Sequence, residues 1–179
     1  LMKKIKNILK ISFYTFFLLA LLLIGISTIN NRIGNCKVEG NIKGLGTTIA
    51  LVTGGTNSKN KTFFRLILVW KGKFSFNVNL NEPGGGRIIS RNMFFKRASG
   101  KPLWMRSKSI DFSLSHNEHI FIEGEMKQYS IDYTIKGNIL SEQASQFRKQ
   151  NLSILEHETR TQLLLDSLTF QNTSKQLID

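Results

Sequence analysis

The sequence predicts a mainly β protein, an antiparallel β-sandwich or barrel of about seven to eight short strands. An apolar helix is expected before the strands and a polar helix after them. Three observations lead to this expectation. Segments in which apolar and polar residues alternate follow one another between residues 36 and 138, and Gly, Asn or Ser residues separate them. Residues 11–29 are apolar without a charge, and the chain after Ser141 contains neither Gly nor Pro.

Residues 1–32 are expected to carry an export signal. Lysines at positions 3, 4, 6 and 10 precede the apolar stretch, and this order is that of a secretory signal. The stretch is also just long enough to cross a bilayer as a helix, and the lysines predict that its start stays in the cytoplasm. Residues 1–32 are therefore either a signal peptide, cut after Ser27, or a single-span membrane anchor.

Cys36 is the only cysteine, which excludes an intramolecular disulfide, a C-x-x-C redox pair and a thiolate zinc cluster. Two roles stay open for it. It is a candidate for lipid attachment, although Asn35 stands before it where a small residue is usual. It also stands two residues before Val38, so both side chains would point to the same face of a strand, and Cys36 would then be a small buried strand residue. A signal peptide, a membrane anchor and a lipid attachment would each place the domain in the cell envelope. The domain would face the periplasm, either anchored in the inner membrane or secreted to the periplasm.

The domain expected at residues 36–138 consists of strands with one solvent-exposed face and one buried face. The segment 62–70 is apolar almost throughout, which predicts a strand with both faces covered. The segment 73–80 is expected to pair back onto it as a hairpin. Residues 84–87, Gly-Gly-Gly-Arg, indicate a flexible turn rather than a phosphate-binding loop. Further strands are expected at 36–44, 47–53, 87–95, 109–115, 119–126 and 129–137.

Residues 139–179 are expected to be a helical segment or linker, part of a longer unit that is truncated here. Apolar residues such as Phe147, Leu155 and Leu168 follow a helical stripe only imperfectly. A lone helix of this kind needs a surface to pack against, so a protein partner is expected to bind through it.

The net charge of +13 is concentrated at the N-terminus and in the middle of the chain. Basic residues favour anionic partners such as acidic glycans or lipid headgroups, and the alternative is a solvated strand face. Basic and aromatic residues also interleave, as in proteins that bind single strands of nucleic acid. The export signal argues against nucleic acid as a partner. The candidate contacts to an anionic surface are Lys71, Lys73, Arg87, Arg91, Lys96, Arg97 and Arg106.

Residues able to carry out catalysis form no recognisable set. His116 and His119 flank Glu118, but no third strong ligand has a metal-site spacing to them, so two exposed turn histidines are expected. No Ser, Asp or Glu lies in a recognisable sequence motif of a catalytic nucleophile or of a general acid or base. We therefore expect no enzyme activity, no cofactor and no metal.

Five segments in order resemble the domain of unknown function numbered 4369, over roughly residues 36 to 150. They are VEGNIKGL, KGKFSFNVNLNEP, IFIEGEM, YTIKGN and the helical SEQASQFRKQ. That module precedes thioredoxin-like domains in exported Gram-negative proteins of the thiol-disulfide interchange and peroxiredoxin-like groups. The resemblance implies a β-rich, periplasm-facing accessory module. It implies no redox activity, because the residues that carry that activity are absent.

The resulting functional hypothesis is a non-catalytic accessory module of the cell envelope that docks onto a partner. The chain departs from the module's pattern at FRLIL, GGGR and SHNEH, and it ends at Asp179, where a thioredoxin-like domain would follow. One alternative is therefore the N-terminal part of a thioredoxin-like thiol-disulfide oxidoreductase. The other is a binder of anionic glycan or headgroups through the basic middle region.

Overall fold

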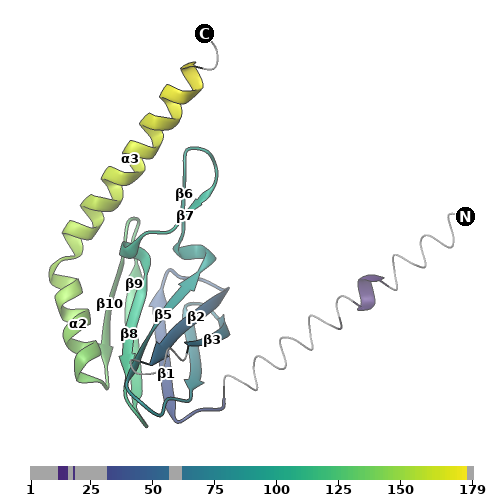
Figure 1. Cartoon of the computed structure of the whole chain (residues 1–179), viewed down its shortest axis with the longest axis vertical. Helices are drawn as coiled ribbons and strands as arrows, with labels where there is room; N and C mark the ends of the chain where they lie inside the picture. The colour runs from purple at the N-terminus through teal and green to yellow at the C-terminus, as the bar shows by residue number, and fades with distance from the viewer. Residues whose placement is uncertain (1–11, 16–17, 19–31, 57–61, 177–179) are drawn as a thin grey trace, which may run out of the picture.

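Figure 1 shows the computed structural model of the chain, which describes residues 12–15, 18, 32–56 and 62–176. The predicted mainly β fold with a helical C-terminal part is confirmed. The described residues form ten strands, more than expected, and two of these are only two residues long. The strands are β1 (Cys36–Lys43), β2 (Thr48–Thr56), β3 (Thr62–Val69), β4 (Lys73–Val78), β5 (Gly84–Ser90), β6 (Phe95–Lys96), β7 (Pro102–Leu103), β8 (Ile110–Leu114), β9 (His119–Met126) and β10 (Ile131–Lys136).

Helical segments complete the described chain. Two short 3-10 helices, η1 (Arg91–Met93) and η2 (Arg106–Lys108), flank the small β6–β7 hairpin. The predicted C-terminal helix is divided at Asn151 into α2 (Ile139–Gln150) and α3 (Leu152–Gln176). In Figure 1, α2 lies beside β10 and α3 continues past the β6–β7 hairpin.

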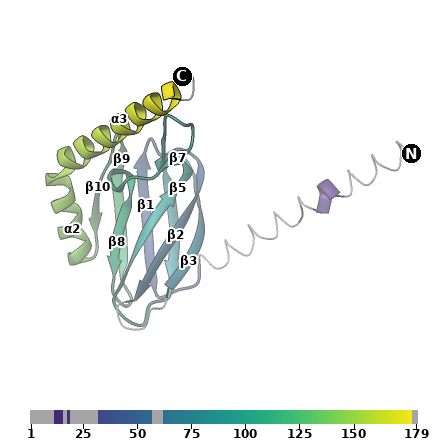
Figure 2. The same ribbon diagram turned by 45° about the horizontal axis from the view of Figure 1, so that its top comes forward.

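The longer strands form two four-stranded sheets, which Figure 2 shows as two layers. Sheet A has the order β10-β9-β1-β4, and sheet B has the order β3-β2-β5-β8. Inward side chains of both sheets form one buried cluster, which includes Val38 and Phe76 of sheet A and Ile67 and Ile88 of sheet B. Burial of this apolar cluster is the main source of the fold's stability.

The purely antiparallel arrangement that the sequence predicts is wrong at one place. β1 and β9 lie side by side in parallel, with Val38 opposite Ile120. Parallel neighbours need a long connection. The chain supplies one, because it forms the whole of sheet B and β4 between these two strands.

The predicted hairpin between residues 62–70 and 73–80 is wrong beyond its turn. The turn itself forms, with φ of 50° at Lys71 and 85° at Gly72, and Trp70 bridges Lys73. Beyond this bridge, β3 belongs to sheet B, whereas β4 pairs with β1 in sheet A. The Gly72 carbonyl oxygen accepts a hydrogen bond from the Ile42 N–H at 2.9 Å. The turn is thus held against the end of β1, and the chain changes sheets there.

Two further expectations about local structure are corrected. β3 does not have both faces covered, because it lies at the edge of sheet B and its side chains alternate between buried and exposed. Residues 84–87 are not a flexible turn but the first half of β5. Gly86 lies opposite Gly54 on one side and Phe112 on the other, so this glycine run is hydrogen-bonded to strands on both sides.

α2 connects the two sheets on the side where β8 and β10 are the edge strands. Asn138 begins the helix, and its Oδ1 accepts from the Ser141 N–H at 2.8 Å. The Ser141 hydroxyl bonds the backbone of Ser113 in β8, and Ser145 Oγ accepts from the Ile135 N–H in β10 at 3.1 Å. One helix face therefore satisfies backbone groups of both sheet edges.

The predicted membrane-spanning stretch, residues 11–29, falls mostly outside the described residues, as does the expected cleavage point after Ser27. Among the residues that the structure describes, no helix has the length and apolar character needed to cross a bilayer.

Candidate docking surface

The outer side of β2 and β3 carries a group of large exposed apolar side chains, which we call the apolar face. In the register of the two strands, Ile49 lies opposite Leu68 and Leu51 lies opposite Leu66. Leu68 is 62% exposed and Ile49 is 61% exposed. Single exposed leucines are common on proteins, but a contiguous apolar patch marks an interaction surface. The apolar face consists of Ile49, Leu51, Phe64, Leu66, Leu68 and Trp70.

Strand geometry explains why these side chains are exposed. Successive residues of a strand point to opposite faces of the sheet, and both faces of β3 are apolar in sequence. Ile67 and Val69 point inward and are buried. Leu68 and Phe64 must then point outward, where the described structure leaves them largely exposed to solvent.

A shallow groove of about 780 Å³ continues the apolar face toward η1 and β6. Its apolar lining includes Ile49, Leu51, Ile89 and Phe94. Arg91 and Lys96 also line it, whereas no carboxylate is among its described lining residues. The groove is therefore suited to an apolar ligand surface that carries a negative charge at its border.

The basic residues predicted to contact an anionic surface fall into two groups, and Lys71, Lys73, Arg91 and Lys96 make up the first. Arg91 and Lys96 meet at the groove, as just described. Lys71 and Lys73 lie at the turn between β3 and β4, and both are exposed. Both pairs border the loop between β1 and β2, because the Gly72 N–H donates to the Gly46 carbonyl oxygen at 2.8 Å and Asn92 Nδ2 donates to the Leu45 carbonyl oxygen at 2.7 Å.

Of the three remaining predicted contacts, Arg87 and Arg97 have carboxylate partners within the protein. Arg87 forms an ion pair with Asp111, and its guanidinium carbon lies 4.9 Å from the centre of the Trp104 ring. Arg97 lies 3.9 Å from the carboxylate of Asp166 in α3. The side chain of Arg106 is exposed, whereas its backbone carbonyl oxygen accepts from the Arg148 guanidinium of α2 at 3.2 Å. These residues join parts of the fold to one another.

The histidines at 116 and 119 are exposed, but they do not come together. His116 Nδ1 lies 3.0 Å from the carbonyl oxygen of Leu80, and His119 Nε2 lies 2.8 Å from a carboxylate oxygen of Glu39. A hydrogen bond from Lys37 lowers the pKa of Glu39, and His119 adds to the effect. Within the described part of the chain, no three His, Cys, Asp or Glu residues are grouped so as to hold a metal ion.

Cys36 is the first residue of β1 and is fully buried, opposite Val78 of β4. Its thiol donates a hydrogen bond to the Ser115 carbonyl oxygen at 3.0 Å. This environment agrees with the interpretation of Cys36 as a small core residue. A lipid on its sulfur would have to displace that packing, and lipid attachment stays a prediction from sequence alone.

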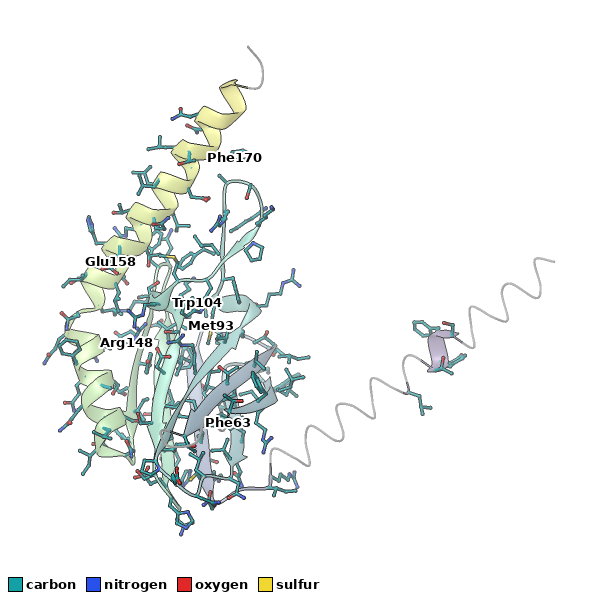
Figure 3. All side chains as sticks on the ribbon, in the orientation of Figure 1. Phe63, Met93, Trp104, Arg148, Glu158 and Phe170 are labelled. Carbon is teal, nitrogen blue, oxygen red and sulfur yellow. The ribbon has the colours of Figure 1, made fainter. Side chains whose placement is uncertain are left out.

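Polar residues attach the helices to the sandwich near η2. Arg148 of α2, which Figure 3 labels, donates to the Ser107 carbonyl oxygen at 2.6 Å and stacks on Tyr133. Burial raises the pKa of the Tyr133 hydroxyl. Lys108 is also buried, with its ammonium nitrogen 4.3 Å from the centre of the Phe95 ring, and burial lowers its pKa. This cluster is structural, because its charged groups bind backbone oxygens and rings of neighbouring elements.

Sequence reasoning missed the apolar face, because a run of apolar residues in an edge strand looks the same as one in a central strand. The sequence did contain a usable signal. Ile67 and Val69 must lie on one face of the strand and Leu66 and Leu68 on the other, so both faces are apolar wherever the strand lies in the sheet. A comparison with family models and with curated proteins finds no match to this chain.

Proposed function

We propose that this chain is a non-catalytic docking module of the cell envelope, which binds a protein partner through the apolar face. The observation that carries the proposal is the contiguous set of exposed apolar side chains on β2 and β3. These side chains lie on β3, the edge strand of sheet B, and on its neighbour β2. Exposing such a surface to water is unfavourable, and covering it with a complementary surface lowers the free energy.

The arrangement of charges favours a protein over an anionic polymer. Arg87 and Arg97 face carboxylates of the same chain, and the pair Arg91 and Lys96 borders an apolar groove. A polyanion grips a continuous basic track, and its affinity falls steeply with salt. Contacts made by Leu68 and Ile49 are instead expected to persist at moderate ionic strength.

The envelope location rests on the sequence of residues 1–32, with lysines before an apolar stretch. We propose that this segment exports the sandwich and, if uncut, holds it at the outer surface of the inner membrane. The resemblance of residues 36–150 to accessory modules of exported proteins, which stays a prediction from sequence, implies the same location.

Site-specific photo-cross-linking tests the docking role. The full chain is produced in cells with a photoreactive benzoylphenylalanine in place of Leu68, and a second sample carries it in place of Phe147. Phe147 is a matched control, because it is 68% exposed and belongs to α2. We expect a discrete protein adduct from position 68, formed equally at low and moderate salt, and none from position 147.

The opposite results would refute the proposal. Equal adducts from both positions would indicate random collisions, and an adduct only from position 147 would place docking on the helices. Loss of the adduct at moderate salt would favour the binding of anionic glycan or headgroups instead.

A further inference from the structure

We infer that the docking segment of the partner is an amphipathic helix whose apolar side is bordered by acidic residues, and that this helix lies in the groove beside the apolar face. The inference rests on the proposed docking function and states the kind of partner that the site fits. Three features of the site support it: the width of the apolar surface, the hairpin that contributes to the groove and the charges around it.

The apolar surface at the groove is three strands wide. Leu51 of β2 lies opposite Leu66 of β3 on one side and opposite Ile89 of β5 on the other, and all three line the groove. Neighbouring strands lie about 4.8 Å apart, so the outer two of these strands are about 10 Å apart. An α-helix with its side chains is about 10–12 Å across. One helix therefore covers this surface.

A strand added to the edge of sheet B would not cover it. β3 is the edge strand, and a further strand would pair beside β3 rather than over the sheet. The outward side chains of Leu51 and Ile89 would gain no contact in that way. The groove is also lined by Phe95 and Pro102 of the β6–β7 hairpin, so its occupant contacts the sheet and the hairpin together. A helix that lies on an apolar sheet face, which is a common arrangement of two layers, makes both contacts.

The groove presents positive charge to its occupant. Arg91 and Lys96 line it, and both are exposed. Neither forms an ion pair with another residue that the structure describes. A third cation, Lys108, places its ammonium nitrogen 4.3 Å from the centre of the Phe95 ring, which also lines the groove. These cations favour an occupant that carries negative charge.

Carboxylates of this chain do not supply that negative charge. In the described strands of sheet B, Asp111 is the single acidic residue, and it forms an ion pair with Arg87. The segment 91–108, which includes the hairpin, contains no acidic residue. Asp166 of α3 reaches the hairpin at Arg97, at 3.9 Å. Glutamates or aspartates at the border of a partner helix can therefore pair with the cations of the groove.

The apolar contacts and the charges have different effects on binding. Burial of Leu51 and its neighbours supplies most of the affinity. Exposed ion pairs contribute little each, and they mainly select the partner and speed its approach. Docking is thus expected to persist at moderate salt, while the preference for an acidic helix weakens. The salt-resistant adduct expected at position 68 agrees with this division.

Photo-cross-linking with defined peptides tests the inference. The full chain carries benzoylphenylalanine in place of Leu51 and is held in nanodiscs of phosphatidylcholine, a lipid without net charge. Three biotinylated peptides of about 18 residues are compared. The acidic peptide has leucines at helical spacing with glutamates at their border, and the basic peptide has lysines in place of those glutamates. The third peptide has the composition of the acidic one, with leucine and glutamate in strict alternation.

We expect the acidic peptide to reach half-maximal labelling of position 51 at a concentration about three- to tenfold below that of the basic peptide at low salt. We expect the alternating peptide to leave position 51 unlabelled, because alternation is the pattern of a strand, and a strand would pair at the sheet edge instead.

Charge reversal at the groove provides a second measurement. Arg91→Glu/Lys96→Glu is expected to reverse the preference, so that the basic peptide labels position 51 at the lower concentration. The matched control is Lys43→Glu/Lys136→Glu, which changes the net charge by the same amount at two exposed lysines of sheet A, and we expect it to keep the preference of the parent. Comparing one peptide between variants cancels its own affinity for the bilayer, and circular dichroism checks that each variant keeps the fold.

Equal labelling by the acidic and basic peptides, or labelling by the alternating peptide, would overturn the inference. So would a reversal of the preference by Lys43→Glu/Lys136→Glu, which would show attraction to the net charge of the protein rather than to the groove. The comparison of peptides on the parent chain needs no charge variant, so it decides the matter even if Arg91→Glu/Lys96→Glu fails to fold.

The results also separate this inference from the proposed function. If position 68 forms a salt-resistant protein adduct in cells and position 51 shows no preference for the acidic peptide, the acidic helix is wrong, and docking through the apolar face still holds. If position 68 forms no protein adduct, the docking function is wrong, and the inference that rests on it is wrong with it.

Discussion

The Ser141 hydroxyl makes two hydrogen bonds to the backbone of a single residue, Ser113. It accepts from the Ser113 N–H at 2.7 Å and donates to the Ser113 carbonyl oxygen at 2.8 Å. Ser113 belongs to β8, which is the edge strand of sheet B. An exposed strand edge presents unpaired backbone groups that attract other chains. The first turn of α2 thus protects this edge with one side chain.

We expect Ser141→Ala to destabilise the fold by about 1–3 kcal/mol, because two backbone groups of Ser113 would lose their hydrogen bond in a buried position. Chemical denaturation followed by tryptophan fluorescence measures the change. Ser153→Ala serves as the control, since Ser153 is exposed in α3. Equal stability of the two variants would show that the hydroxyl does not hold α2 against β8.

Gly40→Ala is expected to destabilise the fold by about 1–3 kcal/mol, because an inward Cβ would overlap the ring of Phe74 on the neighbouring strand. Phe74 is buried and covers the bare backbone of Gly40. A double-mutant cycle with Phe74→Leu measures the coupling. The alanine is expected to cost less in the Phe74→Leu background, and strictly additive effects would contradict this account.

Alternation in the sequence was sufficient to predict strands and much of the core. Phe74, Phe76 and Val78 were expected on one face of a strand, and all three are buried. The side chain of each residue in a strand points to the face opposite its neighbour's, so this part of the fold depends only on local order. The change to helix after residue 138 was predictable for the same reason, since the absence of Gly and Pro is also local.

Pairing between distant segments was not predictable in this way. β1 pairs in parallel with β9, and β3 is an edge strand, because of contacts among residues far apart in the sequence. The position of β3 decides whether Leu68 is in the core or on the surface. The three glycines at 84–86 looked like a turn, because glycine has no side chain that could reveal strand alternation. Their pairing with β2 and β8 reveals the strand.

Two neighbouring residues of β3 test its position at the edge. Ile67→Ala is expected to cost about 2–5 kcal/mol, because Ile67 is buried and its loss leaves a cavity. Leu68→Ala is expected to change stability by no more than about 0.5 kcal/mol, because Leu68 is exposed. Urea denaturation of the wild type and of each variant measures both changes. A large cost for Leu68→Ala would place both faces of β3 in the core.

The buried ammonium of Lys108 gives the fold a pH dependence of a predictable sign. Burial lowers the pKa of Lys108 below its usual 10.5, so the unfolded chain binds this proton more strongly than the folded chain does. The free energy of unfolding therefore rises with pH as Lys108 loses its proton in the folded state, in the window just below 10.5. While Lys108 is charged, its desolvation is only partly offset by the Phe95 ring, whose centre lies 4.3 Å from the ammonium nitrogen.

Lys108→Met is expected to remove this dependence while keeping the packing of the side-chain stem. The free energy of unfolding of the wild type is expected to rise relative to that of the variant as the pH approaches 10.5 from below, since only the wild type gains from deprotonation. Comparing the two proteins cancels the titration of the other lysines and of Tyr133, which are common to both. Lys101→Met is the control, because Lys101 is exposed and lies in the same hairpin region. Parallel pH profiles for the wild type and Lys108→Met would show that the ammonium reaches water.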